Sequence, residues 1–286
     1  PWERGETPRV MLIAPYYHRI VRPLSIIEKN LRTEENSTED LLKDLNIIRL
    51  LRSNGIYNLE EMKRAGAPMG LLRVGTAAKK KGYNVNILDA VNEGFNRERK
   101  SFETSEGSQI YTYGLTKEEI VRKIQDFNPH IVGISIDYTH QWGNAREIAD
   151  LVKTLDEKAI VVMGGTHVNG LPEDALLDSP TDYVVQRQAD QTFPELLDIL
   201  TRRKLSLEGV RGIKGIVYRK DQKLVKTEVR DFFSNIDDIA IPDLSLINLS
   251  IYNRKYHSAG KAKLNHKNIL YGFTSTGCDV RCRFCA

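Results

Sequence analysis

Short apolar runs alternate with amphipathic segments along residues 9–203 of the chain. Runs that are apolar throughout predict strands buried on both faces, as in a parallel sheet, and alternating runs predict half-buried strands. Segments with helical spacing separate them. The predicted strands span residues 9–17, 83–90, 130–138, 159–165 and 182–186.

Two of the intervening segments carry clear helix-end signals. The segment 67–82 opens with Pro68 and closes on Gly82, which is the usual asymmetry of a helix. Residues 116–119 read TKEE, a capping box in front of a helix with one apolar face. Further helices are predicted at residues 144–157, 172–178 and 193–203.

This alternation predicts an α/β fold with a Rossmann-like, flavodoxin-like parallel sheet and right-handed crossovers. Ligands of such sheets bind at the carboxyl ends of the strands. Here the strand ends are rich in Gly, Asn, His and Tyr, as a polar cradle requires. They cover residues 15–19, 89–94, 135–142, 164–170 and 186–191.

Two stretches interrupt the pattern, and the chain changes character after residue 205. Residues 29–66 are predicted to form an insertion with a helix at 39–52. The favoured interpretation is that this helix packs on the domain, and the alternative is that the insertion covers the strand ends as a lid. Residues 92–114 are polar and predict no element. Beyond residue 205 we expect a hairpin that turns at Lys220–Asp221, followed by an extended connector.

The composition describes a globular protein without a membrane segment. Hydrophobic residues make up 41% of the chain and charged residues 28%, and no apolar run approaches the ~20 residues of a membrane helix. Forty-two basic and thirty-eight acidic residues leave a net charge of +4 with no basic face. We therefore expect a cytoplasmic protein that binds neither nucleic acid nor membrane.

All three cysteines lie in the last ten residues, GCDVRCRFCA, at Cys278, Cys282 and Cys285. A cytosolic compartment keeps such thiols reduced, so the spacing C-x3-C-x2-C points to a metal site. Three thiolates suit an iron-sulfur cluster that keeps one iron open for a ligand. A structural zinc site, the alternative, needs a fourth donor such as His257 or His266.

The cysteine spacing, with an aromatic residue before the third cysteine, resembles the cluster loop of radical S-adenosylmethionine enzymes. The resemblance implies that Cys278, Cys282 and Cys285 hold a 4Fe-4S cluster whose fourth iron binds S-adenosylmethionine. It also implies that Phe284 lies beside the adenine, and that an electron donor such as a flavodoxin or ferredoxin reduces the cluster. Residues 263–286 would then start the (β/α) barrel of that family.

The preceding part resembles the cobalamin-binding domain of one branch of the same superfamily. The likeness lies in the order of VMLIAP, PMGLL, GYNVNILDA, IVGISI, IVVMGGTHV and DYVVQRQADQTFPELL, followed by GIVYR and IPDLSLI. It implies that Ser135, Gly164 and Gly165 line the slot for the nucleotide tail of cobalamin. Thr166 and His167 would follow on the same wall.

Two features depart from that family's patterns. Cobalamin domains with D-x-H-x-x-G after the first strand use its histidine to ligate cobalt, whereas YYHRIV here has only His18. We therefore expect cobalt to be bound without this histidine. The segment after the fifth strand reads RQADQ, where relatives often have GEGE.

The combined reading predicts a cobalamin-dependent radical S-adenosylmethionine enzyme that acts on a small molecule. A methyltransferase acting on an unactivated carbon or phosphorus is favoured; a ring-closing or ring-contracting enzyme and a non-catalytic corrinoid- or zinc-binding module are the alternatives. The predicted domains are 1–205 for cobalamin, 206–262 for hairpin and connector, and 263–286 for the barrel start. Both chain ends suggest a piece of a longer polypeptide, inactive by itself.

Overall fold

The computed structural model of this chain describes most of the predicted cobalamin domain and connector. The described residues are 6–33, 38–55, 58–60, 66–187, 189–201, 207–221, 223–231, 233, 235–252, 256–257 and 263–264. The cysteine triplet, Phe284 and His266 lie outside these ranges.

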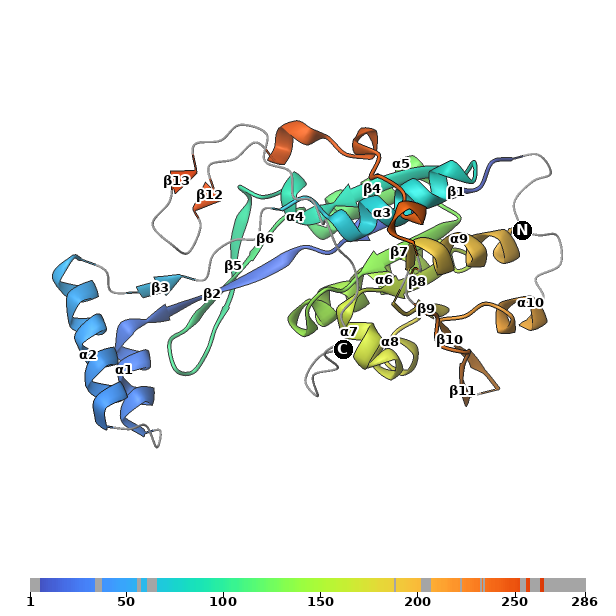
Figure 1. The fold of residues 1–286 in the computed structure, drawn as a ribbon. Helices are drawn as coiled ribbons and strands as arrows, with labels where there is room; N and C mark the ends of the chain where they lie inside the picture. The colour runs from blue at the N-terminus through green and yellow to red at the C-terminus, as the bar shows by residue number, and fades with distance from the viewer. Residues whose placement is uncertain are drawn as a thin grey trace.

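A seven-stranded sheet forms the centre of the fold, in the order β11-β10-β9-β8-β7-β1-β4 (Figure 1). Its five parallel strands follow the flavodoxin-like order of a doubly wound sheet, so the predicted fold class is confirmed. The parallel strands are β1 (Arg9–Ala14), β4 (Asn84–Asp89), β7 (Ile131–Ser135), β8 (Ile160–Gly164) and β9 (Tyr183–Val185).

Helices cover both faces of this sheet. On one face lie α5 and α6 with the short helices α7 and α8, and on the other lie α3 and α9. The bounds are α3 (Met69–Lys80), α4 (Ala90–Glu93), α5 (Lys117–Phe127), α6 (Trp142–Leu155), α7 (Thr166–Gly170), α8 (Pro172–Leu177), α9 (Ala189–Leu200) and α10 (Leu207–Arg211). The predicted capping box at the start of α5 is confirmed, with both reciprocal bonds between Thr116 and Glu119.

The side chains of β1 show how the two cores share the sheet. Met11 and Ile13 point into the core under α5 and α6, whereas Val10 and Leu12 point into the core under α3 and α9. All four are at most 1% exposed, as expected for a central parallel strand. Complete burial of Leu72 from α3 adds roughly 1.5–3 kcal/mol of transfer free energy.

A second, antiparallel sheet was missed by the sequence reading. It has the order β3-β2-β6-β5, with β2 (Tyr17–Pro23), β3 (Asn58–Glu60), β5 (Glu98–Glu103) and β6 (Gln109–Tyr113). The excursion from the first sheet thus begins at Tyr17 and not at residue 29. The predicted irregular stretch 92–114 supplies two of its strands.

Two helices extend from this second sheet. They are α1 (Leu24–Thr33) and α2 (Thr38–Ser53), and α2 confirms the helix predicted at residues 39–52. The pair lies at the far end of the second sheet from the seven-stranded sheet (Figure 1). Glu28 of α1 forms an ion pair with Arg52 of α2 at 2.8 Å.

The predicted hairpin after residue 205 extends the main sheet. Strands β10 (Ile216–Lys220) and β11 (Lys223–Lys226) pair antiparallel to each other, and β10 pairs antiparallel to β9. Asp221 adopts a φ of 49° at the turn. Beyond the hairpin come short 3-10 helices η2 (Ile236–Asp238), η3 (Leu244–Leu246) and η4 (Leu249–Tyr252), then β12 (Tyr256–His257) and β13 (Lys263–Leu264). The domain boundaries stay a prediction.

Candidate cofactor cleft

The carboxyl ends of the five parallel strands meet at one edge of the main sheet, as predicted. Two clefts open along this edge, and they share Gly70, Leu71, Ser135 and Asp137. We call them the inter-helix cleft and the edge cleft. Because they share part of their lining, they form one continuous groove across the strand ends.

The inter-helix cleft lies between α3, α9 and the ends of β7, β8 and β9, and its cavity volume is about 160 Å³. This volume lies below the ~300–1,000 Å³ of whole small-molecule sites, so the cleft has room for only one part of a large ligand. Its walls are largely apolar, with Leu71 and Val74 from α3 and Phe193 from α9. The groove therefore combines an apolar slot with a polar rim.

Three glycines, Gly133, Gly164 and Gly165, form the floor of the inter-helix cleft, and each is suited to its position for a different reason. A Cβ on Gly133 would lie 2.7 Å from Leu12 Cδ2, so any side chain would push into the core. Gly165 has a φ of 107°, and a Cβ there would lie 2.5 Å from the carbonyl oxygen of Ile136. The conformation of this turn thus requires glycine at position 165.

Gly164 differs from the other two because the backbone does not demand glycine there. A Cβ at this position would meet only the carbonyl oxygen of Val185, at 3.6 Å, an ordinary contact distance. Since Gly164 lines the cleft, a side chain there would occupy cleft volume. The absence of a side chain at Gly164 therefore leaves this part of the cleft open.

The loop after β7 forms the polar rim between the two clefts. Ser135 donates a hydrogen bond from Oγ to Asp137 Oδ1 at 3.3 Å. The side-chain oxygen of Gln141 accepts from the backbone nitrogens of Asp137 and Tyr138, each at 2.9 Å. Gln141 is buried and therefore holds the loop in one conformation.

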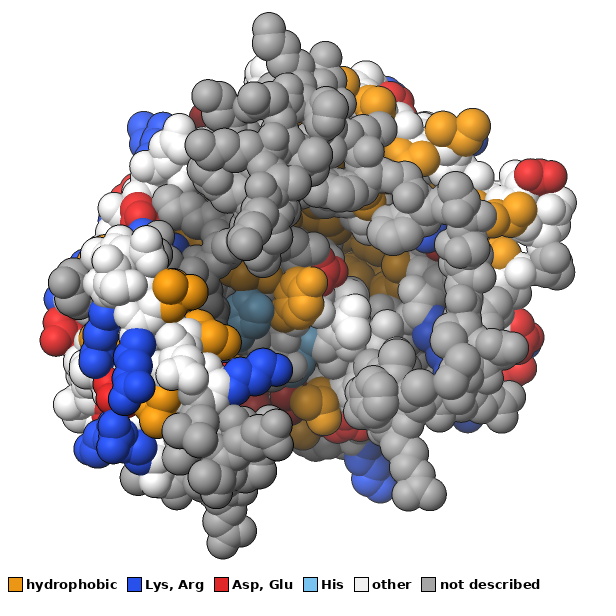
Figure 2. Space-filling model, turned by 60° about the vertical axis from the view of Figure 1, so that its left-hand side comes forward, with side chains coloured by type: hydrophobic (Ala, Val, Ile, Leu, Met, Phe, Trp, Pro, Cys, Tyr) orange, Lys and Arg blue, Asp and Glu red, His pale blue; other side chains and the backbone are white. Residues whose placement is uncertain are grey.

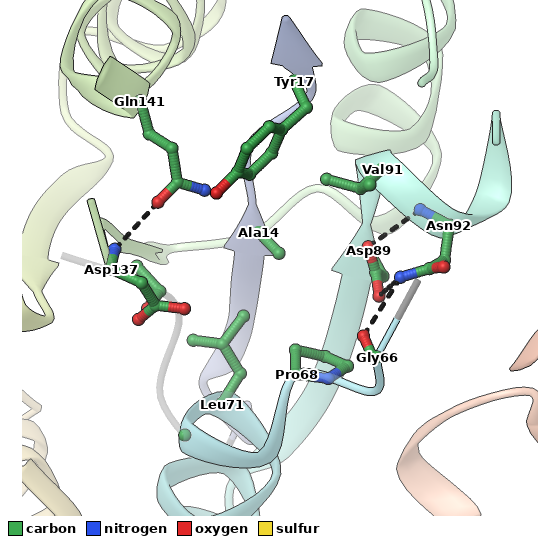
Figure 3. Close-up of a pocket in the computed structure, with 12 residues that line it drawn as sticks. Ala14, Tyr17, Gly66, Pro68, Leu71, Asp89, Val91, Asn92, Asp137 and Gln141 are labelled. Carbon is green, nitrogen blue, oxygen red and sulfur yellow. Dashed lines mark hydrogen bonds between the residues drawn. The ribbon is translucent and has the colours of Figure 1, made fainter. Parts of the chain in front are cut away.

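The edge cleft lies over the ends of β1, β4 and β7 and has a cavity volume of about 40 Å³ (Figure 3). Tyr17 and Gln141 lie on one side and Asp89 and Asn92 on the other. Asp89 caps the short helix α4 by accepting from the backbone nitrogen of Asn92 at 3.0 Å. Burial raises the pKa of the Asp89 carboxyl, against hydrogen bonds from Asn92 and Tyr252 that lower it.

Aromatic and histidine rings gather near the same edge. The ring of Tyr17 lies 5.0 Å from His140 in an edge-on arrangement, and Tyr138 stacks on His140 at 5.6 Å. Figure 2 shows a hollow on one face of the molecule in which hydrophobic and histidine side chains are exposed together. Such rings provide flat surfaces for a ring-shaped ligand.

The structure brings together only part of the predicted cofactor set. Ser135, Gly164 and Gly165 line the inter-helix cleft, whereas Thr166 and His167 begin α7 and are not among its lining residues. His167 is buried, with Nδ1 3.3 Å from Thr139 Oγ1 and its ring 5.7 Å from that of Trp142.

His18 is held by two neighbours away from both cleft linings. Asn144 donates its amide nitrogen to the Tyr16 carbonyl at 2.8 Å, so its oxygen faces His18 Nε2 at 2.9 Å. His18 Nε2 therefore donates, and Nδ1 accepts from Thr112 Oγ1 at 2.8 Å. Burial lowers the pKa of His18, which favours this neutral ring. Both ring nitrogens of His18 are engaged within the protein, and cobalt binding without this histidine stays a prediction.

The predicted cluster ligands Cys278, Cys282 and Cys285 and the predicted adenine contact Phe284 lie outside the described residues. Among the residues that are described, no group of three or more His, Cys, Asp or Glu side chains is placed to hold a metal. Within the same ranges, every helix is too short or too polar to cross a bilayer.

Sequence reasoning missed several groove residues. Phe193 reads as an ordinary apolar position of an amphipathic helix, and Leu12 as a core residue of a strand. Asp89 was placed at a ligand-bearing strand end, but its partner Tyr252 lies 163 residues away in an extended segment. No local pattern connects those two positions.

Residues 58–197 match the B12 binding domain family. This match covers just under half of the chain. Strand β1 precedes the matched range, and β2, α1 and α2 lie between β1 and the start of the match. Most of the residues that line the glycine-floored groove thus lie in the part of the chain that matches this family.

Curated relatives match beyond the B12 binding domain itself. An uncharacterized methyltransferase of Pyrococcus horikoshii is 29% identical over 77% of this chain and 40% of its own length. Cytidylyl-2-hydroxyethylphosphonate methyltransferase of Streptomyces wedmorensis is 26% identical over 82% and 47%. 4'-Phospho-dehydrooxetanocin synthase of Priestia megaterium is 25% identical over 60% and 21%. The chain therefore spans less than half the length of these relatives.

Among solved structures, the radical S-adenosylmethionine methyltransferase TsrM from Kitasatospora setae is similar to this chain. The form with cobalamin and a [4Fe-4S] cluster bound matches at a TM-score of 0.47 and 16% identity, over 88% of this chain and 36% of that one.

The neutral state of His18 predicts a pH effect on stability. As the pH falls through 6.5, the ordinary pKa of histidine, unfolded His18 takes up a proton that the folded ring resists. The free energy of unfolding therefore falls with falling pH, and His18→Gln should make this fall shallower. Denaturant unfolding at pH 5 to 8 measures it. Parallel curves for the two proteins across the whole range would contradict the neutral assignment.

Proposed function

We propose that this chain is the cobalamin-binding part of a cobalamin-dependent radical S-adenosylmethionine methyltransferase. The observation that carries the proposal is the glycine-floored cleft at the ligand edge of a B12 binding domain. The cysteine triplet and two relatives named as methyltransferases support it. In this proposal the substrate is a small molecule, and the cluster is reduced by an electron donor such as a flavodoxin or ferredoxin. The protein acts in the cytoplasm.

The inter-helix cleft suits the nucleotide tail of cobalamin, which ends in a flat aromatic base. Leu71, Val74 and Phe193 supply apolar surface, and Gly164 leaves room that a side chain would fill. The Ser135 hydroxyl lines the rim and would bond a polar atom of the tail. Thr166 and His167 contribute by fixing the turn after β8.

The corrin ring would lie across the edge cleft, where the groove continues from the tail slot. Gln141 holds the loop beneath it, and Asp89 and Asn92 brace the opposite side. Bound together, the cofactors would supply the chemistry for transfer of a methyl group from S-adenosylmethionine to an unactivated carbon or phosphorus. The residues of this chain bind, orient and shield that assembly from water.

For the second cofactor set, Cys278, Cys282 and Cys285 are the proposed ligands of a 4Fe-4S cluster. Their thiolates would hold three irons, and the fourth iron would bind S-adenosylmethionine. Phe284, between two of the ligands in sequence, would contact the adenine.

A second candidate function is ring closure or ring contraction by the same cofactors. The relative from Priestia megaterium favours it, since its name is that of a synthase and not of a methyltransferase. Products formed by the full-length protein distinguish the two, because methyl transfer adds one carbon to the substrate and ring closure adds none.

Gly164→Leu should block cobalamin binding without unfolding the protein. The leucine side chain has space only inside the cleft, so it competes with the tail, and we expect hydroxocobalamin affinity to fall at least about tenfold. Absorption titration of the full-length protein with hydroxocobalamin measures the affinity.

Gly143→Leu is the matched control, because a side chain at this exposed position of α6 meets nothing within 4 Å. It should bind hydroxocobalamin like the wild type. Equal affinity in the Gly164 variant, with an unchanged melting temperature, would remove the inter-helix cleft as the tail site.

Cys282→Ala should abolish the iron-sulfur absorbance after anaerobic reconstitution with iron and sulfide, because two thiolates do not retain the cluster. Hydroxocobalamin binding should stay nearly intact, since the two cofactors are assigned to separate segments. Metal analysis alongside absorption decides between cluster and zinc. Zinc in place of iron in the wild type would favour the non-catalytic module.

A further inference from the structure

The connector Asn235–Tyr252, which leads from the hairpin toward the cysteine triplet, is attached to the B12 binding domain at two points. The first attachment is at Asp243 on α3. Lys79 Nζ lies 2.7 Å from Asp243 Oδ2, and the backbone nitrogen of Asp243 donates to Thr76 Oγ1 at 2.7 Å. Leu246 packs over Gly75, where a Cβ would lie 3.2 Å from Leu246 Cδ1.

The second attachment is a buried hydrogen bond at the end of η4. Tyr252 donates from its hydroxyl to Asp89 Oδ2 at 2.8 Å. The two residues are 4% and 3% exposed, so water does not compete for this bond. Asn92 supplies two further donors to the same carboxyl, its backbone nitrogen at 3.0 Å and its side chain at 2.8 Å.

The donor set shows what Tyr252 contributes. Every partner of the Asp89 carboxyl is a donor, and a buried carboxyl oxygen that loses a donor is left unsatisfied, which is costly. A hydrogen bond to such a group also fixes the orientation of the Tyr252 side chain, which apolar packing alone does not. Asp89 is moreover a lining residue of the edge cleft. The connector is therefore bonded to the wall of the proposed cofactor site.

We infer that the Tyr252–Asp89 hydrogen bond is a positioning anchor. It fixes the point at which the chain leaves the B12 binding domain and so sets how the cysteine-bearing segment approaches the cobalamin edge. The inference rests on the proposed function. Tyr252 and Asp89 act as positioning residues, since they hold the connector and take no part in bond making.

The test is Tyr252→Phe in the full-length protein, which removes one oxygen atom and keeps the buried ring. The matched control is Tyr83→Phe, because Tyr83 also donates its hydroxyl to an aspartate, Asp198 Oδ1 at 2.9 Å, and lines neither of the two clefts. Hydrogen exchange followed by mass spectrometry reports on connector peptides 236–252 without any cofactor. Asp89→Asn is a second variant, since its single side-chain oxygen cannot serve all three donors.

We expect connector exchange to become at least about fivefold faster in Tyr252→Phe and Asp89→Asn and to stay unchanged in Tyr83→Phe. After reconstitution with iron, sulfide and hydroxocobalamin, and then reduction, the magnetic coupling between cob(II)alamin and the cluster should weaken in the same two variants. In Tyr252→Phe, hydroxocobalamin affinity should stay within about twofold of wild type, because Tyr252 is not among the cleft-lining residues. This expectation does not extend to Asp89→Asn, since Asp89 lines the edge cleft.

Two outcomes overturn the inference, and they differ from each other. Wild-type connector exchange in Tyr252→Phe would show that the bond anchors nothing, whatever the cofactors do. Faster exchange with unchanged cluster–cobalt coupling would show an anchor without a positioning role. Failure of the proposed function is separate, because it appears as absent corrin binding in the wild type itself.

Discussion

The structure depends on a gap that glycine keeps open between two helices and a parallel sheet. Helices α3 and α9 pack against each other and on the sheet, yet the floor at Gly133 and Gly164 has no side chains to close the space. Gly165 completes the floor through a turn that no other residue adopts without strain. A cavity with apolar walls is costly to leave unfilled, so the gap is best understood as the place of a ligand.

The second constraint is a polar contact between residues that lie far apart in the sequence. Asp89 ends β4, caps α4 and binds Tyr252, so one buried carboxyl ties together a strand end, a helix start and the connector. Lys79 and Thr76 hold the connector again at Asp243. The fold thus joins the groove at the strand ends and the connector in one arrangement.

Local signals explain which elements the sequence predicts. The parallel strands, the capping box at Thr116 and helix α2 depend on nearby residues, and the structure confirms them. The second sheet depends on pairing between distant segments, and β5, with the sequence ERKSFE, is too polar and exposed to be predicted as a strand. Ser135 and the glycine pair follow predicted strands directly, so the sequence could place them at the groove. The contribution of Phe193 to the groove and the bond from Tyr252 to Asp89 depend on contacts between distant segments, so the sequence could not predict them.

Hydrogen exchange of the full-length protein with and without hydroxocobalamin tests the central claim most directly. The account predicts slower exchange in the presence of corrin for peptides that contain residues 133–137, 164–170 and 189–193, and little change in α1, α2 and the second sheet. Protection confined to other segments, or none at saturating hydroxocobalamin, would contradict the assignment of the groove.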